Sequence, residues 1–233
     1  MKPIFQYIIL FVLGTTLVSC ELDNVEPPKS LLTGQIVYQG TPLHLEPNRV
    51  SFDLYQDGFG KTGALGSNFD KDGAFSHLLF DGEYKMVIPS GQGPFVSLET
   101  GGSETSPINI NLRGSASLNI EVVPYWVIKN ASLSISSGTV SSDFALEQIA
   151  AGSDAKNIER VTLYISKTQF ANSQTNVATS TIQMGDITDI NAVSLSAQVP
   201  DLVPAQDYVF ASVGVKIAGV DDMIFSPTEK MNL

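Results

Sequence analysis

The sequence predicts an all-β protein built from two β-sandwich domains in tandem. After residue 30 there is no long stretch with a 3.6-residue apolar period. Instead, short runs rich in Val, Ile, Phe, Tyr and Thr alternate with turns rich in Gly, Pro, Asp and Asn, a pattern typical of strands joined by tight turns. The chain has 233 residues, of which 43 % are hydrophobic, so it can fill two cores of about 100 residues each.

The first 19 residues are predicted to be a signal peptide. Lys2 supplies a positive charge, and the segment from Ile4 to Val18 is almost wholly apolar. This segment is shorter than the roughly 20 residues that a membrane-spanning helix needs. It also ends in small residues, which indicates a secretory signal rather than a membrane span. Cleavage before Cys20 would leave residues 20–233, which are 214 residues.

Cys20 is the only cysteine, and it ends the sequence Leu17-Val18-Ser19-Cys20. This sequence resembles a bacterial lipobox, which implies that Cys20 is lipidated and that the membrane is a partner through the lipid anchor. An ordinary signal peptide with a chance cysteine is the alternative. A lone cysteine is unusual in an exported protein, however, and lipidation explains it.

Residues 20–30 are predicted to be a tether. The acidic stretch from Glu21 to Glu26 follows Cys20 directly and resembles the surface-export signal of Bacteroidetes lipoproteins. The resemblance implies attachment to the outer membrane with the protein facing the cell exterior, the periplasmic face being the alternative. Pro27 and Pro28 then predict a stiff spacer, because proline favours extended conformations.

Residues 31–123 are expected to form the first sandwich. Alternation of apolar and polar residues predicts strands at 32–38, 50–55, 83–88, 108–112 and 116–123. The sequence from Phe69 to Phe75 is expected to be a hairpin closed by Asp72-Gly73, since glycine tolerates positive φ. Asp81-Gly82 predicts a second such turn.

Three segments in order carry a resemblance for this first half: Thr33–Val37, Asp70–Phe75 and Asp81–Ile88. Together they are similar to the carboxypeptidase regulatory-domain, or transthyretin-like, β-sandwich. In that family a glycine opens the first strand, a D-x-D/N-G-x-F turn follows, and a G-x-Y strand closes the core. The resemblance covers residues 31–123.

Residues 124–233 are expected to form the second domain, with Pro124 marking the boundary. Strands are predicted at 131–136, 159–166, 177–183, 193–199, 208–217 and 223–225. The stretch from Ser142 to Asn157 has apolar residues at helical spacing, so it is expected to be a helix or a loop with one helical turn. Leu202-Val203-Pro204-Ala205-Gln206-Asp207-Tyr208 resembles the tyrosine corner of fibronectin type III domains, except that Ala205 stands where glycine is common.

The lipobox, the regulatory-like half and the fibronectin-like half occur together, and the quoted segments include residues 54–58, 79–82 and 162–168. The combination resembles a surface lipoprotein family of Bacteroidetes polysaccharide-utilisation (Sus-like) loci. The resemblance implies a TonB-dependent porin and its glycan-capturing partner lipoprotein as neighbours. It implies no catalytic residues, so no enzyme activity is expected.

Residue types that carry chemistry are scarce. His44 and His77 are the two histidines, and there is no HExxH, GxSxG or P-loop motif. Asn68–Gly73 mimics the start of an EF-hand loop, but Leu79 stands where calcium needs a glutamate, so a turn is the preferred interpretation. A glycosidase needs two carboxylates about 5–9 Å apart, whereas the acidic residues here fall mostly in turns. We expect no catalytic residue, metal or cofactor, and the net charge of −11 argues against nucleic acid.

Aromatic residues beside turns give the one hint of binding. Tyr55, Phe59 and the single tryptophan, Trp126, are the candidate sugar-stacking residues, with packing in the core as the alternative. The leading hypothesis is an accessory glycan-binding lipoprotein of a glycan-uptake system. A structural module that docks on the porin complex and an adhesin-type stalk subunit are the alternatives.

Overall fold

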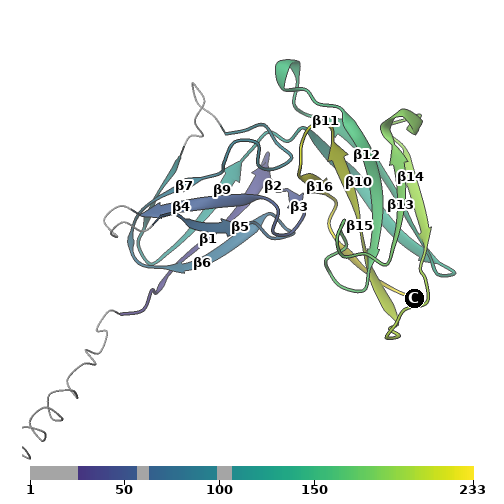
Figure 1. Cartoon of the computed structure of the whole chain (residues 1–233), viewed down its shortest axis with the longest axis horizontal. Coiled ribbons are helices and arrows are strands. Elements are labelled where there is room, and N and C mark those ends of the chain that lie inside the picture. Colours follow the sequence, from purple (N-terminus) through teal and green to yellow (C-terminus); the bar gives the residue numbers. More distant parts are fainter. Residues whose placement is uncertain (1–25, 57–62, 99–106) are drawn as a thin grey trace, which may run out of the picture.

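The computed structural model describes residues 26–56, 63–98 and 107–233, which form two β-sandwiches side by side (Figure 1). The prediction of an all-β protein is confirmed. The predicted signal peptide, Cys20 and Phe59 lie outside the described residues. No helix within the described residues is long and apolar enough to cross a membrane.

The first sandwich has two four-stranded sheets. In one, β1 (Ser30–Tyr38) lies between antiparallel β6 (Ala74–Leu79) and parallel β9 (Ser115–Glu121), and β2 (Thr41–Pro42) extends its end. In the other, the order is β5 (Leu65–Asn68), β4 (Ser51–Gln56), β7 (Gly82–Val87) and β8 (Ile108–Leu112). All pairs in this second sheet are antiparallel.

Aromatic rings fill the core between these two sheets. Phe52 packs with its ring centroid 4.7 Å from that of Phe69 and 5.0 Å from that of Phe75. Gly34 on β1 leaves room for this cluster, since a Cβ there would overlap the ring of Phe75. The alternation predicted for the two central strands is confirmed. The inward residues of these strands are all buried: Val50, Phe52, Leu54, Tyr84, Met86 and Ile88.

The prediction of a hairpin around Asp72-Gly73 is wrong, because the strands on either side of the turn do not pair with each other. The turn itself is tight: Asp70 N–H donates to the Ala74 carbonyl (2.9 Å), the Asp70 carboxylate accepts from Asp72 N–H and Ala74 N–H, and Gly73 has φ +66°. However, β5 before the turn and β6 after it lie in different sheets. The turn therefore carries the chain across the core, and Phe69 and Phe75 face each other through the core.

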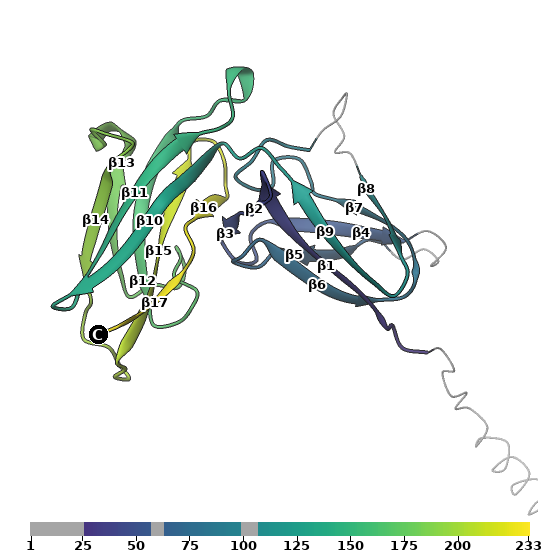
Figure 2. The same cartoon turned by 180° about the vertical axis from the view of Figure 1, so that it is seen from behind.

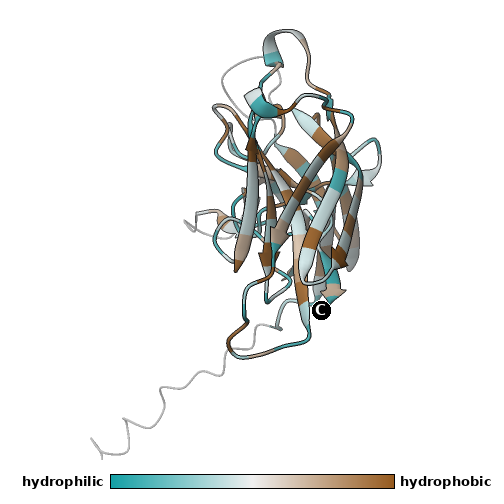
Figure 3. Ribbon diagram, turned by 90° about the vertical axis from the view of Figure 1, so that its right-hand side faces the viewer, coloured by the Kyte–Doolittle hydropathy of each residue, from teal (hydrophilic) through white to brown (hydrophobic). Residues whose placement is uncertain are grey.

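The second sandwich also has two sheets (Figure 2). One contains β10 (Trp126–Ser136), β11 (Thr139–Gln148) and β14 (Val193–Gln198) in that order. In the other, β12 (Ile158–Ser166) lies between β13 (Ala178–Gln183) and β15 (Tyr208–Ile217). Two short strands, β16 (Met223–Phe225) and β17 (Glu229–Asn232), pair with opposite ends of β15. Apolar and polar residues alternate along the strands of this domain (Figure 3).

The helix predicted within Ser142–Asn157 is wrong, because residues up to Gln148 belong to β11. This strand pairs on both sides, with β10 and with β14, and its residues Val140, Phe144 and Leu146 are buried. The apolar residues of this segment therefore follow the two-residue period of a strand, although their spacing also fits a helix. One turn of 3₁₀ helix does follow, at Gly152–Asp154, and another lies at Met184–Asp186.

The tyrosine corner is not formed as expected. Tyr208 begins β15, but its hydroxyl makes no hydrogen bond to any described residue; instead Lys230 Nζ lies 3.9 Å from the centroid of its ring. The side chain of Gln206 instead links this corner to the neighbouring backbone, since its Nε2 donates to the carbonyls of Lys167 (3.2 Å) and Tyr208 (2.6 Å).

A strand of the first sandwich completes a sheet of the second. The two-residue strand β3 (His44–Leu45) pairs with β16, with Leu45 opposite Ile224 and His44 opposite Phe225. Both cartoon views show β3 at the junction (Figures 1 and 2). The division expected between residues 123 and 124 does not anticipate this shared sheet.

Two buried carboxylates flank the shared sheet. Glu46, 5 % exposed, accepts hydrogen bonds from the backbone N–H (3.2 Å) and the hydroxyl of Ser173. Asp222, 4 % exposed, accepts from Gly93 N–H at 2.7 Å. Each bond joins the two sandwiches, so the junction is held by main-chain pairing and by two charge-assisted contacts, which are stronger than neutral hydrogen bonds.

Candidate functional site

A cleft of about 430 Å³ lies between the two sandwiches. Its first wall is the segment from Tyr38 to His44. The opposite wall comes from residues 127–131 on β10 and from Ile224, Phe225 and Pro227 beside β16. This volume is within the range of roughly 300–1,000 Å³ found for small-molecule sites, which often lie between domains.

The first wall is built by a two-residue hairpin between β1 and β2. Gln39 and Gly40 both have positive φ (50° and 74°), as type I′ hairpin turns require. The carboxylate of Glu121 accepts the N–H groups of both turn residues. The turn holds Tyr38, which is half-buried, at the edge of the cleft, where the Tyr38 hydroxyl accepts a hydrogen bond from Gln39 Nε2 at 3.0 Å.

The opposite wall contains a bulge in β10. The pairing with β11 shifts register between Lys129 and Ser132, and Asn130 has φ +52°. Bulges re-aim side chains, and here both Lys129 and Asn130 line the cleft. Lys129 Nζ is 3.3 Å from the carboxylate of Glu147, and both side chains are about half exposed.

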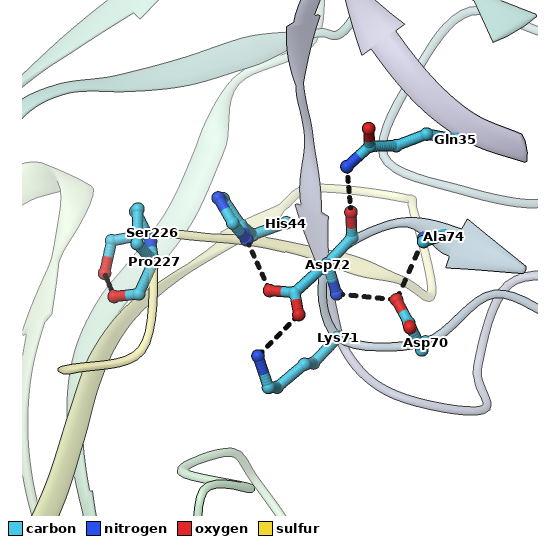
Figure 4. Close-up of polar contacts among 8 residues, drawn as sticks. All are labelled: Gln35, His44, Asp70, Lys71, Asp72, Ala74, Ser226 and Pro227. Atoms are coloured by element: carbon cyan, nitrogen blue, oxygen red, sulfur yellow. Dashed lines mark hydrogen bonds and ion pairs between the residues drawn. The ribbon is translucent and has the colours of Figure 1, made fainter. Parts of the chain in front are cut away.

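His44 is the cleft residue with the most defined polar surroundings (Figure 4). Its Nδ1 is 3.2 Å from Asp72 Oδ1, and Lys71 Nζ is 2.6 Å from Asp72 Oδ2. Gln35 Nε2 fixes the same turn by donating to the Asp72 carbonyl at 3.2 Å. The ring of His44 lies between Asp72 and the Ser226–Pro227 segment of the second sandwich.

Charge and burial act in opposite directions on Asp72. Burial favours its neutral form, but the hydrogen bond and charge of Lys71, with His44, outweigh burial and hold the pKa of Asp72 below its usual value. Asp72 is therefore a carboxylate at neutral pH and can accept a hydrogen bond from His44 Nδ1–H, 3.2 Å away. In the neutral tautomer that carries its proton on Nδ1, Nε2 has a lone pair and can accept a hydrogen bond.

Of the three aromatic residues expected to bind sugar, the two that the structure describes, Tyr55 and Trp126, do not line the cleft. Tyr55 is 43 % exposed on β4 but does not line the cleft, and Phe59 lies outside the described residues. Trp126 is only 5 % exposed, and its Nε1 donates to the Lys156 carbonyl at 2.7 Å. A ring buried in this way cannot stack on a sugar from solvent, so the alternative interpretation of Trp126 as a packing residue is the correct one.

Sequence analysis named His44 but gave it no binding role, and it did not single out Tyr38. Asp72 is 28 residues from His44, and no local pattern links them. The one sequence signal near Tyr38 is the turn that Gln39-Gly40 predicts directly after it.

The remaining histidine has no place in the cleft. His77 packs against Phe52 and Phe75, with ring centroids 5.7 Å and 5.9 Å away, and its buried Nε2 has no hydrogen-bond partner among the described residues. Burial lowers the pKa of His77 below its usual value. Over the described part of the chain, no group of three or more His, Cys, Asp and Glu side chains is placed to hold a metal ion.

A second hollow of about 560 Å³ lies at the open edge of the first sandwich. It runs beside β8 and β9, and its apolar lining includes Val96, Leu98, Leu118 and Val123. Tyr38 lines both hollows. Among the described residues that line it, the edge groove has no polar cluster comparable to His44, Asp72 and Lys71. The interdomain cleft is therefore the better candidate for recognising a polar ligand.

Fold and cleft define a two-domain β-sandwich protein whose domains share a sheet and enclose a candidate binding site. The chain belongs to the DUF3823 family. Residues 30–123 match the family model described as "Protein of unknown function (DUF3823) N-terminal domain". Residues 126–230 match the model described as "Domain of unknown function (DUF3823_C)".

Solved structures from Bacteroidetes resemble the whole described chain. A DUF3823 family protein from Parabacteroides merdae is 34 % identical with a TM-score of 0.75, over 89 % of this chain and 100 % of that one. One from Bacteroides ovatus is 26 % identical with a TM-score of 0.73, over 88 % and 100 %. A protein from Bacteroides uniformis, described as "a putative carbohydrate binding protein", shares the fold at 14 % identity and a TM-score of 0.67, over 88 % and 100 %. A search of curated proteins found no match.

Proposed function

We propose that the chain is a lipid-anchored accessory protein of a glycan-uptake system and that it binds oligosaccharide or polysaccharide in the cleft between its sandwiches. It acts by binding rather than by catalysis. The observation that carries this proposal is the cleft itself, where an aromatic ring and several uncharged polar side chains from both domains converge. The description of the B. uniformis protein of the same fold supports it.

The cleft offers the two kinds of contact that sugars use. The ring of Tyr38 and the prolines Pro42 and Pro227 provide flat apolar surface for the C–H faces of a pyranose. Gln39, Thr41 and Asn130 provide amide and hydroxyl groups for the hydroxyls at its rim. A few placed polar groups on an apolar lining are the usual composition of a small-molecule site.

The proposed anchor is compatible with an accessible cleft. Ser30 begins β1 and Tyr38, the last residue of that strand, lines the cleft; at about 3.3 Å per residue the two are separated by about 26 Å. Cys20 is ten residues before Ser30, a span of at most about 35 Å. A lipid on Cys20 would therefore hold the end of the first sandwich that lies away from the cleft.

The test is affinity electrophoresis of the chain lacking residues 1–20 in native gels that contain a panel of plant and host polysaccharides. Retardation by one glycan, lost in Tyr38→Ala and kept in Tyr55→Ala, supports binding in the cleft. Retardation that is lost in Tyr55→Ala and kept in Tyr38→Ala would move the site to the exposed face of β4. No retardation across the panel would contradict glycan binding.

A docking module for a TonB-dependent porin is the second candidate, favoured by the apolar edge groove and by Val123, which is 47 % exposed there. Here the expected result is co-purification of a porin from detergent-solubilised membranes without glycan retardation. Val123→Glu should then abolish porin retention, whereas Tyr55→Ala should not.

A further inference from the structure

We infer that the cleft is selective for neutral glycans, which it recognises through His44 Nε2, and that it rejects glycans bearing carboxylate or sulfate groups. This inference rests on the proposed function and adds the class of ligand. It follows from how the charged groups around the cleft are already paired.

Of the described residues that line the cleft, only Lys129 and His44 can carry a positive charge. Lys129 is paired with Glu147 at 3.3 Å, and His44 is paired with Asp72 at 3.2 Å. A carboxylate or sulfate on the ligand would have to displace Glu147 from the Lys129 ammonium, or Asp72 from His44 Nδ1. Without that exchange it would lose its water with no compensating charge, which is costly.

The net negative charge of the whole chain also disfavours anionic ligands. The chain has a net charge of −11, and a field of one sign repels ligands of that sign and slows their association. Glu121 lies behind the Gln39–Gly40 turn and adds negative charge at the first wall. An uncharged polysaccharide meets neither obstacle.

His44 supplies the polar contact that a neutral sugar needs. With Nδ1–H donating to Asp72, Nε2 of the neutral tautomer is an acceptor, and it faces away from Asp72 (Figure 4). Sugar hydroxyls are good donors, and the other uncharged polar side chains that line the cleft are amides or hydroxyls that can accept or donate in turn. Asp72 is here a positioning residue, since it acts through His44.

The test compares matched ligands in the same native gels: xylan, galactomannan, arabinan and starch, each beside its carboxymethylated derivative, with polygalacturonate and dextran sulfate added. We expect one or more neutral polymers to be retained and their carboxymethylated forms to bind at least ten-fold more weakly. Equal or tighter binding of the anionic forms would overturn the inference and leave glycan binding intact. Failure of every polymer to bind would overturn the proposed function and the inference with it.

Two substitutions test the role of His44 on the retained polymer. His44→Phe keeps a ring but removes Nε2, so affinity should fall about three- to ten-fold, the usual worth of one hydrogen bond. His44→Gln places an amide oxygen near the same position and should restore most of the affinity. Equal affinities in wild type and His44→Phe, with both proteins showing the same circular dichroism, would exclude recognition through Nε2.

Discussion

The backbone of Leu45 in the first sandwich is paired with that of Ile224 in the second, so the two domains share one sheet. The pairing is only two residues long, yet buried polar contacts on both sides support it. We therefore expect the two sandwiches to unfold together in one transition, and several measurements can test the contacts that hold them.

Asp222→Ala should lower the free energy of unfolding by about 1–3 kcal/mol, because Gly93 N–H would be left buried without its acceptor. Asp221→Ala is the matched control: its side chain is exposed, so a change within about 0.5 kcal/mol is expected. Urea titration followed by circular dichroism measures both. Equal effects of the two substitutions would contradict the role given to Asp222.

Gly34→Ala should destabilise the first sandwich by about 1–3 kcal/mol through overpacking. A Cβ at this position would overlap Phe75 and lie 2.7 Å from the Leu118 carbonyl. Gly66→Ala on β5 is the control, since its Cβ would meet only Asp53 Oδ1 at 3.5 Å. Thermal unfolding measures the melting temperatures of both variants. Equal melting temperatures for Gly34→Ala and Gly66→Ala would refute the packing argument.

Stability should fall as the pH drops below about 6.5, the usual pKa of histidine. Burial lowers the pKa of His77, so the unfolded chain binds more protons than the folded chain between the lowered value and the usual one. The contribution of His77 is therefore complete above the usual pKa and is lost as the pH falls toward the folded value.

Unfolding midpoints between pH 5 and pH 7, where histidine titrates, should show this loss in the wild type. His77→Phe should flatten the dependence, because it removes the group whose pKa burial lowers. The carboxylates of Asp72 and Asp81 have pKa values below their ordinary value of 3.8, so their contributions are lost only at lower pH. A His77→Phe curve parallel to the wild type would show that another group causes the slope.

Cys20→Ala should release the protein from membranes, because several acyl chains each contribute about 0.8 kcal/mol per buried CH₂. Membrane fractionation with antibody detection measures the change, and Ser19→Ala, which leaves the cysteine in place, is the control. Persistence of the Cys20→Ala protein in the membrane fraction at wild-type levels would argue against a lipid anchor.

Local pattern determined which parts of this fold could be predicted. The strands Ile108–Leu112, Tyr208–Ile217 and Met223–Phe225 have the predicted limits, because strict alternation or dense β-branched residues specify them without help from distant segments. The turn at Asp70–Gly73 was also predictable, since glycine and aspartate set its geometry. Which sheet each of the two flanking strands belongs to depends on contacts with the rest of the domain. For that reason the prediction that these strands form a hairpin failed.

The site depends almost wholly on contacts between distant residues. His44 meets Asp72 only because the strands around them fold into one sandwich, and it lies opposite Phe225 only because β3 pairs with β16. Exposure is equally nonlocal. Trp126 and Tyr55 are both aromatic residues on strands. Trp126 is buried and donates a hydrogen bond to the Lys156 carbonyl, whereas Tyr55 is exposed to solvent.

The strand β3 also acts as a cover for the open edge of β16. Met223, Ile224 and Phe225 are all buried, and a chain truncated to the second sandwich alone would leave this apolar edge without a neighbour. Uncovered edges of this kind invite pairing with other chains. The second sandwich on its own is thus expected to be prone to edge-to-edge association, because the first sandwich carries the strand that covers this edge.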